Sequence, residues 1–296
     1  MDLLSKEEAT TFVENVLGLI DIQMRLNTDK LTFLNDMIYE YHCKVPFHNL
    51  DLLALPVSER RIPNLAELKD RGLSGRGGLC YQNNTFLYFV LRALGYDVTL
   101  AKGHVKNPGD HVLLVAHDVV TSGDSYLIEA AIGYPTLRAI LLDFQVESPV
   151  YTFSFCTFKY VRQDGGEFHR MHKEESDLEK TWRRVYSFNP AYCILKDFES
   201  SMVIPYTDPT SAFLNSFRAV RFPNGKLLAI KNNSILEDKN GKVFSTEFKD
   251  SEALTNALSL LFPMLNSPKE VMKSAVEMIE TFKCEIKHIH PIMSGP

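Results

Sequence analysis

The stretch Arg76-Gly77-Gly78-Leu79-Cys80-Tyr81-Gln82-Asn83-Asn84 joins a glycine-containing turn to a predicted helix. From Phe86 to Leu94, apolar residues recur three and four positions apart, which is the period of an amphipathic helix, and Gly95 stands where such a helix ends. Cys80 is therefore expected in the first helical turn, where unpaired N–H groups and the positive end of the helix dipole favour a thiolate. The glycines allow backbone conformations that a Cβ disfavours, and they leave space beside the sulfur. The stretch predicts a nucleophilic cysteine.

A nucleophilic cysteine needs a base, and the base needs an orienting group. His111 begins an apolar run, and Glu129 interrupts the next one. A carboxylate inside an apolar strand is costly without a charged or hydrogen-bonding partner, and an imidazole on a neighbouring strand would be such a partner. A hairpin turn at 122–124 would make the two strands neighbours. The sequence therefore predicts Cys80, His111 and Glu129 as a catalytic triad.

Each of these residues also has a simpler structural interpretation. A lone cysteine is more often a small core side chain than a nucleophile. His111 alone would be a histidine at a strand end whose hydrogen bonds are all made, and Glu129 could lie on a solvated face of its strand. The three residues in this order favour the catalytic interpretation. The remaining histidines and cysteines show no ligand spacing, so no metal site is predicted.

Composition limits the classes of function. The chain has 296 residues, of which 45% are apolar and 23% charged, and this allows one large domain or two to three small ones. The net charge of −5 argues against general affinity for nucleic acid or for anionic membranes. The first residues include acidic side chains and no run of about 18 apolar residues occurs, so neither a signal peptide nor a membrane helix is expected. Five widely spaced cysteines without a C-x-x-C pair predict a reducing, cytoplasmic location.

The first 95 residues are predicted to form a small helical bundle. Ser5 and Glu8 have the spacing of a capping box, and an apolar stripe continues to Ile20. Thr28 is expected to cap a second helix, and Asn64 to begin a short third helix ahead of the cysteine-bearing one.

The middle of the chain changes to the period of β-strands and predicts an antiparallel sheet or barrel of about 90 residues. Turn signals at 107–109 and 122–124 separate short apolar runs. The charged stretch 167–184 is expected to be an exposed loop or edge, with 181–188 returning as a strand. The other predicted strands are 97–105, 111–117, 125–132 and 151–161.

The last third is predicted to mix helices with a β-meander. A short helix at 195–202 comes first. Two helices close the chain, one over 251–262 and one beginning at Ser267, where serine followed by proline is a helix-start signal. Between them, the predicted strands are 217–222, 227–231 and 243–248.

The chain resembles the arylamine N-acetyltransferase family at several motifs that occur in the same order. The cysteine stretch is similar to the family's R-G-G-x-C-x-[EQ]-x-N motif, and 45–50 is similar to its V-P-F-E-N-L stretch. The strand from His111 resembles the one that begins with the family's catalytic histidine. The run 126–133 resembles the strand that carries its catalytic aspartate in D-x-G-F-G, and 208–213 resembles its P-x-S-x-F segment.

This resemblance implies an α+β fold with a cysteine-protease-like core. Its parts would be an N-terminal helical bundle over 1–95 that carries the nucleophile, a central antiparallel β-barrel over 96–190 that carries the histidine and the glutamate, and a C-terminal α/β lid over 191–296.

The resemblance also implies an acyltransferase with a ping-pong mechanism. Acetyl-CoA would acetylate Cys80, and an arylamine, hydrazine or related amine would then take the acetyl group. The partners would be a small-molecule amine and acyl-CoA, with no permanently bound cofactor. The residues implied to bind the amine or CoA are Phe47, Gly103, His104, Val105, Asp110, Ile132, Gly133 and Ser211.

Several positions depart from the family pattern. Glu129 replaces an aspartate, whose side chain is shorter by roughly 1.5 Å. Ala131 and Ile132 replace the glycine and the phenylalanine of D-x-G-F-G, which predicts a less arylamine-like acceptor. His48 replaces the glutamate of V-P-F-E-N-L, so an ion pair from that position to Arg76 is not expected.

Two other functions remain open from the sequence. The same triad could join other acyl thioesters to amines, as amide synthases similar to this family do. The chain could also be a catalytically weak relative that binds CoA or a partner. The sequence does not indicate the acceptor amine or the oligomeric state.

Overall fold

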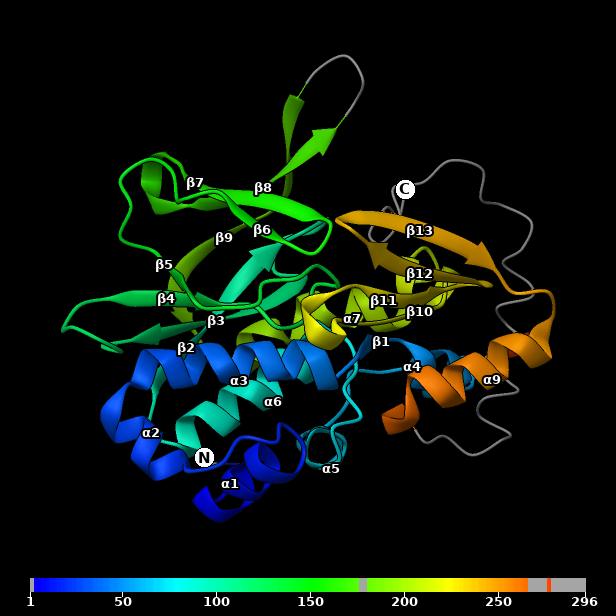
Figure 1. The fold of residues 1–296 in the computed structure, drawn as a ribbon, viewed down its shortest axis with the longest axis horizontal. Helices are drawn as coiled ribbons and strands as arrows, with labels where there is room; N and C mark the ends of the chain where they lie inside the picture. The colour runs from blue at the N-terminus through cyan, green and yellow to red at the C-terminus, as the bar shows by residue number, and fades with distance from the viewer. Residues whose placement is uncertain (1–2, 176–179, 266–275, 278–296) are drawn as a thin grey trace.

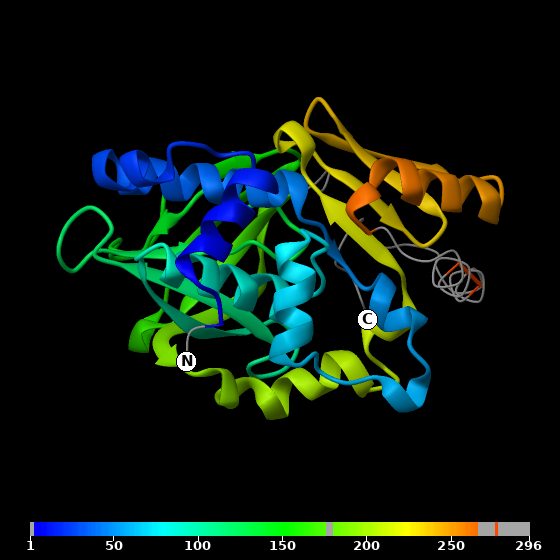
Figure 2. The same cartoon turned by 90° about the horizontal axis from the view of Figure 1, so that it is seen from below.

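The computed structural model describes residues 3–175, 180–265 and 276–277, and within them helices lie against two antiparallel sheets (Figure 1). The N-terminal helices, blue to cyan, lie beside the larger sheet, and the smaller sheet with the helix of residues 251–261 lies to one side of them, as the view from below also shows (Figure 2). The predicted α+β class is confirmed. No helix in these ranges is both long and apolar enough to cross a membrane.

The N-terminal helices begin where local capping signals predict. Ser5 caps α1 and Glu8 completes the capping box. In α5, Asn64 is the cap and Glu67 completes the box. Gly95, with φ 89°, follows the end of α6 as predicted. The helices of this part are α1 (Lys6–Asn15), α2 (Ile22–Thr28), α3 (Lys30–Lys44), α4 (Leu50–Ala54), α5 (Leu65–Leu73) and α6 (Cys80–Ala93).

Two predictions for this part are wrong. The cap of α3 is Asp29, whose carboxylate accepts a hydrogen bond from the Thr32 N–H, whereas Thr28 is the last residue of α2, a helix that was not predicted. Ile20 does not continue the apolar stripe. It lies beyond α1 and is 68% exposed, because Gly18 turns the chain at a positive φ of 69°.

The larger sheet is antiparallel and curled, and within the described residues it has eight strands in the order β5-β4-β3-β2-β9-β8-β7-β6 (Figure 1). Helix α6 packs against β2 and β3, and the residues between them belong to the main hydrophobic core. The strands are β2 (Asp97–His104), β3 (His111–His117), β4 (Ser125–Ile128), β5 (Ile140–Leu141), β6 (Tyr151–Phe153), β7 (Cys156–Arg162), β8 (Phe168–Glu175) and β9 (Lys180–Cys193).

The prediction that 167–184 is an exposed loop or edge is wrong, although the strand expected over 181–188 is confirmed as part of β9. Strand β8 lies inside the sheet between β9 and β7. Its Arg170 is fully buried because the guanidinium donates hydrogen bonds to Thr136 Oγ1 and the Pro135 carbonyl oxygen, and lies 4.1 Å from the ring centre of Phe158.

Two other strand predictions need correction. The run 151–161 is a hairpin and not one strand, because Ser154 turns the chain at φ 53° between β6 and β7. The strand predicted over 125–132 ends at Ile128, so Glu129 comes directly after it.

The smaller sheet combines a segment from the N-terminal third with strands from the last third. In the described part of the chain its order is β1-β10-β11-β12-β13, and β1 pairs with β10 through Phe47 and Val220. Neither β1, which has two residues, nor β12 was predicted. The strands are β1 (Phe47–His48), β10 (Arg218–Arg221), β11 (Leu228–Lys231), β12 (Ser234–Lys239) and β13 (Lys242–Glu247).

In the last third of the chain, helices come before β10 and after β13. The helix predicted at 195–202 is confirmed as a 3₁₀ turn (Leu195–Phe198) that leads into α7 (Glu199–Thr207), and a short α8 (Ala212–Asn215) follows. Helix α9 (Ser251–Leu261), also predicted, packs against the sheet through Leu254 and Leu258. The helix predicted from Ser267 lies outside the described residues, and the division at 95/96 and 190/191 stays a prediction.

Candidate active site

The turn before Cys80 requires both of its glycines. Gly77 has φ 75°, and a Cβ there would lie 2.1 Å from the Pro46 carbonyl oxygen. A Cβ on Gly78 would lie 2.6 Å from the carboxamide carbon of Gln82. At Gly77 the obstacle is backbone, which cannot move aside, and at Gly78 it is the end of a side chain, but the φ of 156° there still disfavours a residue with a Cβ. The space that a Cβ would take at either glycine is filled by Pro46 and Gln82, so the glycines themselves do not make the opening beside the sulfur that was predicted.

Cys80 is the first residue of α6, as predicted from the sequence, and Leu79 is the N-cap residue. The side-chain oxygen of Gln82 accepts hydrogen bonds from the Leu79 N–H at 2.8 Å and from the Tyr206 hydroxyl at 2.7 Å. The Cys80 sulfur lies 4.0 Å from the Asp110 carbonyl oxygen, and the residue is 5% exposed. The sulfur thus lies at a helix N-terminus whose first turn is fixed by the two hydrogen bonds of the Gln82 side chain.

Strand pairing brings His111 and Glu129 together. The predicted hairpin is confirmed, since β3 pairs with β4 through Leu114 and Ile128. His111 begins β3, Glu129 follows β4, and His111 Nε2 lies 2.5 Å from Glu129 Oε2. His111 is 2% exposed and Glu129 is 0% exposed, so the alternative of a solvated glutamate is wrong.

Asn84 connects the cysteine helix to the Glu129 carboxylate. Its Nδ2 donates to Glu129 Oε1 at 3.2 Å and to the Val112 carbonyl oxygen at 2.6 Å, and its Oδ1 accepts from the Ala130 N–H. The Ala131 N–H also donates to Glu129 Oε1, at 2.9 Å. Both carboxylate oxygens are therefore hydrogen-bonded, which fixes the orientation of the group that contacts the imidazole.

The charges of the buried pair support each other. Burial lowers the pKa of His111, but the Glu129 carboxylate and a hydrogen bond with the Cys80 side chain outweigh burial and raise that pKa to about 10. Burial raises the pKa of Glu129, but the His111 charge and the hydrogen bonds to the carboxylate hold it below its usual range. Both shifts favour the ion pair, an imidazolium beside a carboxylate.

Asp51 supplies the ion pair that position 48 does not. Arg76 donates to Asp51 through Nε at 3.0 Å and through a terminal nitrogen at 2.5 Å, and Arg71 also contacts this carboxylate. His48 is buried and contacts the Arg76 carbonyl oxygen through Nε2 at 3.1 Å. Burial lowers the pKa of His48 to about 4, so the imidazole is neutral at pH 7. The arginine that begins the cysteine stretch is thus anchored from another position.

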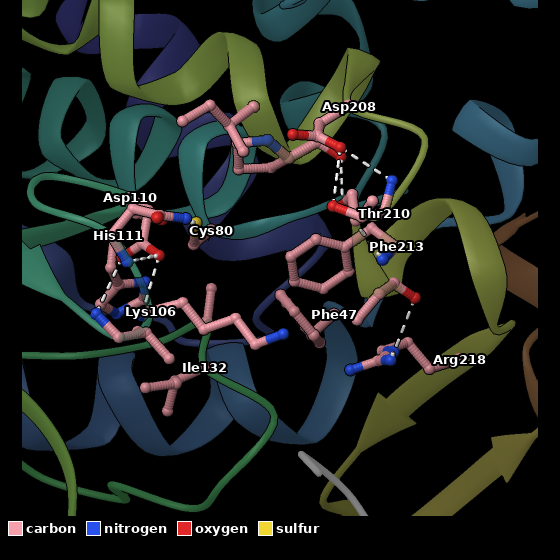
Figure 3. Close-up of a pocket in the computed structure, with 17 residues that line it drawn as sticks. Phe47, Cys80, Lys106, Asp110, His111, Ile132, Asp208, Thr210, Phe213 and Arg218 are labelled. Carbon is pink, nitrogen blue, oxygen red and sulfur yellow. Dashed lines mark hydrogen bonds between the residues drawn. The ribbon is translucent and has the colours of Figure 1, made fainter. Parts of the chain in front are cut away.

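A cavity of about 490 Å³ opens beside Cys80 and His111. Figure 3 shows these two residues on one side of it and Phe213 and Arg218 on the other. The cavity is lined by Phe47, Cys80, Val105, Lys106, Asn107, Asp110, His111, Ala131, Ile132, Ile204, Pro205, Asp208, Thr210, Ser211, Ala212, Phe213 and Arg218.

Five of the eight binding residues predicted from the resemblance line this cavity: Phe47, Val105, Asp110, Ile132 and Ser211. The other three, Gly103, His104 and Gly133, are not among the residues that line it.

Gly103 pairs with His111 across β2 and β3, where a Cβ would lie 3.1 Å from the His111 side chain. His104 Nδ1 accepts a hydrogen bond from the Gly109 N–H at 2.7 Å. Gly133 follows Ile132 at φ 78°. A role for these three residues in binding stays a prediction.

Sequence reasoning missed several residues of the site. Asn84 was visible as the last residue of the cysteine motif, one helical turn after Cys80, and this spacing was a usable signal for a residue on the same helix face. Arg218 and Lys106 gave no such signal, because nothing in their local sequence shows that they share a cavity.

Among the described residues, no group of three or more His, Cys, Asp or Glu side chains could hold a metal ion. The cysteines described as free are Cys43, Cys80, Cys156 and Cys193.

Comparison with known proteins gives a consistent result. A family model described as N-acetyltransferase matches residues 30–266. Arylamine N-acetyltransferase 1 of Felis catus is 28% identical over 235 residues, which are 71% of this chain and 86% of that protein. The uncharacterized acetyltransferase YvcN of Bacillus subtilis is 30% identical over 230 residues, which are 74% of this chain and 84% of that protein.

Solved structures share the fold. The arylamine N-acetyltransferase of Salmonella typhimurium has a TM-score of 0.78 at 19% identity and covers 94% of this chain and 100% of its own. The arylamine N-acetyltransferase of Mycobacterium marinum in complex with CoA has a TM-score of 0.76 at 18% identity and covers 92% of this chain and 98% of its own.

Proposed function

Because this chain belongs to the arylamine N-acetyltransferase family, we propose that it transfers an acetyl group from acetyl-CoA to an aromatic amine, a hydrazine or a related amine through a thioester on Cys80. The observation that carries the proposal is the buried contact of 2.5 Å between His111 and Glu129 beside a cysteine at a helix N-terminus. A cavity next to the sulfur supports it further.

In the first half-reaction, the Cys80 thiolate attacks the thioester carbonyl carbon of acetyl-CoA. A new C–S bond forms to Cys80, and the bond to the CoA sulfur breaks. The protonated His111 gives its proton to the departing CoA thiolate, so that acetylated enzyme and free CoA result. The raised pKa of His111 supports this role, since the imidazole then holds a proton at neutral pH.

In the second half-reaction, the amine attacks the carbonyl carbon of acetyl-Cys80. Neutral His111 takes the proton from the amine nitrogen, the C–S bond breaks, and the thiolate–imidazolium pair forms again with release of the amide. Negative charge on the carbonyl oxygen in each half-reaction would be stabilised by backbone N–H groups in the first turn of α6, which have no helical acceptor.

Glu129 and Asn84 act through His111. Since Glu129 Oε2 contacts Nε2, the carboxylate leaves Nδ1 of the ring for Cys80 and the substrate. Asn84 fixes the other carboxylate oxygen from the helix that carries the nucleophile. We therefore propose Glu129 and Asn84 as positioning residues.

The walls of the cavity are suited to a small amine with an apolar body. The rings of Phe47 and Phe213 meet edge to face with centres 6.0 Å apart, and Ile132 lines the cavity with them. Since Ile132 stands in place of the family's phenylalanine, the acceptor loses one aromatic contact. We further propose a cytoplasmic location, because a reactive thiol persists in a reducing compartment.

Mass spectrometry of the intact protein after incubation with acetyl-CoA tests the proposal. We expect a mass increase of one acetyl group, mapped to Cys80 by peptide analysis, and its loss on addition of an aromatic amine. Cys80→Ser should abolish the thioester, and Cys193→Ser, a change at a half-buried cysteine outside the cavity, should leave it intact. Absence of an adduct with acetyl-CoA would contradict the proposed function.

A further inference from the structure

Arg218 is a buried cation on the wall of the cavity. It begins β10, is 4% exposed, and lines the cavity together with Phe47 and Phe213. One terminal nitrogen donates to Ser216 Oγ at 2.6 Å and to the Ala212 carbonyl oxygen at 3.3 Å. Its Nε, also buried, has no hydrogen-bond partner. The guanidinium is therefore held by neutral groups and keeps an unused donor.

The acidic side chains of the cavity do not neutralise this charge. Asp110 accepts hydrogen bonds from three backbone N–H groups, those of residues 105–107, and Asp208 accepts from the Thr210 N–H and hydroxyl. Across the part of the chain that the structure describes, neither Arg218 nor Lys106 forms an ion pair. Figure 3 shows the Lys106 side chain extending across the cavity toward Arg218 from the opposite side.

The neighbourhood of Arg218 is positively charged as well. Lys231 on β11 pairs with Arg218 across the sheet. Burial and the charge of Arg218 together lower the pKa of Lys231 to about 8, and burial lowers the pKa of Arg218 to about 10. A buried cation without a counter-charge destabilises the fold. Neutral donors could make the two hydrogen bonds to Ser216 and Ala212, so these bonds alone do not explain an arginine.

We propose that Arg218, with Lys106 opposite, binds a carboxylate of the substrate that fills the cavity, so that the enzyme prefers a carboxylated substrate over its neutral counterpart. The proposal rests on the proposed function for the reaction but not for the binding. A planar carboxylate can accept two hydrogen bonds from a guanidinium.

Two sources of the carboxylate fit the same contacts. An acceptor amine such as an aminobenzoate would place its ring beside Phe47 and Phe213, whose ring centre lies 5.1 Å from the Arg218 guanidinium carbon. A donor such as malonyl-CoA would present the carboxylate on the acyl group instead. Both sources need the same cation.

Calorimetry on the unacylated protein tests binding without any turnover. 4-Aminobenzoate and 4-aminobenzamide have nearly the same shape and differ in charge. We expect at least one carboxylated probe, 4-aminobenzoate or malonate, to bind about tenfold more tightly than its neutral amide. Equal affinities for both pairs would overturn the proposal, even if Cys80 is acetylated normally.

Variants separate a binding role from a structural one. Arg218→Gln should reduce the preference for the carboxylated member about tenfold and leave the neutral member nearly unchanged, and Arg218→Lys should restore part of it. Arg221→Gln is the matched control, since Arg221 lies on the same strand, also has an Nε without a partner, and does not line the cavity. Equal losses for carboxylated and neutral compounds in Arg218→Gln would show a structural role and overturn the proposal.

Turnover measurements identify the source. A loss in kcat/KM confined to aminobenzoate indicates the acceptor, and a loss confined to malonyl-CoA compared with acetyl-CoA indicates the acyl group. A rise in the KM of acetyl-CoA alone, with a neutral amine, would assign Arg218 to the CoA phosphates and overturn the proposal. If Arg218→Gln does not fold, the preference of the unmodified protein decides the outcome. Failure of acetylation with a retained carboxylate preference would contradict only the proposed function.

Discussion

Replacing Glu129 by glutamine tests the electrostatic basis of the site. The change keeps the shape of the side chain and removes its charge. Two unit charges about 4 Å apart attract by about 4 kcal/mol at an effective dielectric constant of about 20, which is roughly a thousandfold in a proton-binding constant. The carboxylate oxygen contacts His111 Nε2 at 2.5 Å, so this attraction is the main reason that the His111 pKa lies at about 10 despite burial.

Without the carboxylate, only the contact with Cys80 still opposes the effect of burial, so the pKa of His111 falls. The imidazolium that would stabilise a thiolate beside it is then weakened. We expect the rate of Cys80 acetylation in Glu129→Gln to fall roughly 10²–10⁴-fold, which is the range for loss of a general acid–base function.

Two assays follow this change. Single-turnover acetylation gives the rate, and iodoacetamide alkylation of Cys80 against pH reports the thiolate. In Glu129→Gln, alkylation below neutral pH should be slower than in the unmodified protein, because the positive charge beside the sulfur is weakened. Glu147→Gln is the control, since Glu147 is an exposed carboxylate in an ion pair of 2.6 Å with Lys159.

The reasoning would be refuted if Glu129→Gln were alkylated at pH 6 as fast as the unmodified protein and acetylated within about threefold of its rate. Glu129→Asp tests the same contact by shortening the side chain while keeping its charge. The shorter side chain should lose the contact with Nε2 unless the backbone shifts, so we expect a partial loss of rate, intermediate between the unmodified protein and Glu129→Gln.

Three further perturbations test other parts of the site. Gly77→Ala should destabilise the fold by more than about 2 kcal/mol in urea denaturation, because its Cβ would lie 2.1 Å from a carbonyl oxygen, whereas Gly95→Ala, with nothing within 4 Å, should cost only about 1 kcal/mol for its positive φ. Asn84→Ala should lower kcat about tenfold and shift the pH profile of Cys80 alkylation, and an unchanged profile would argue against a positioning role. Burial lowers the pKa of His42, like that of His48, to about 4, below the unfolded value of 6.5. The unfolded chain therefore binds more protons than the folded one between pH 6.5 and 4. The free energy of unfolding keeps its full value above this window and decreases as pH falls through it, by up to about 1.4 kcal/mol per pH unit for each histidine. His42→Gln and His48→Gln should each reduce that slope.

Short-range signals in the sequence predicted the parts of the fold that depend on short-range interactions. A capping box joins residues three positions apart, so Ser5 and Asn64 marked the starts of their helices correctly. Thr28 and Asp29 are adjacent and both can cap a helix, so the choice between them depended on the preceding helix α2, which carries no clear pattern. The turn at 122–124 predicted a real hairpin, and with it the meeting of His111 and Glu129.

Partners far apart in the chain decided the rest. The charges of 167–184 suggested exposure, but Arg170 is buried because Thr136 and Phe158 surround its guanidinium in the folded protein. The two residues of β1 gave no periodic signal and form a strand only because β10, more than 150 residues later, pairs with them.

The sequence by itself determined that Cys80 begins a helix, since two glycines, a cysteine and a helical period act within a dozen residues. Only the tertiary structure decided what surrounds the sulfur. Asp51 forms the ion pair with Arg76, although position 48 carries no acid. Asn84 holds the Glu129 carboxylate, and Arg218 lines the cavity from a strand of the last third. The physical reason is that burial and counter-charge depend on distance in space, and an arginine has the same local sequence signal whether or not an acid lies beside it in the fold.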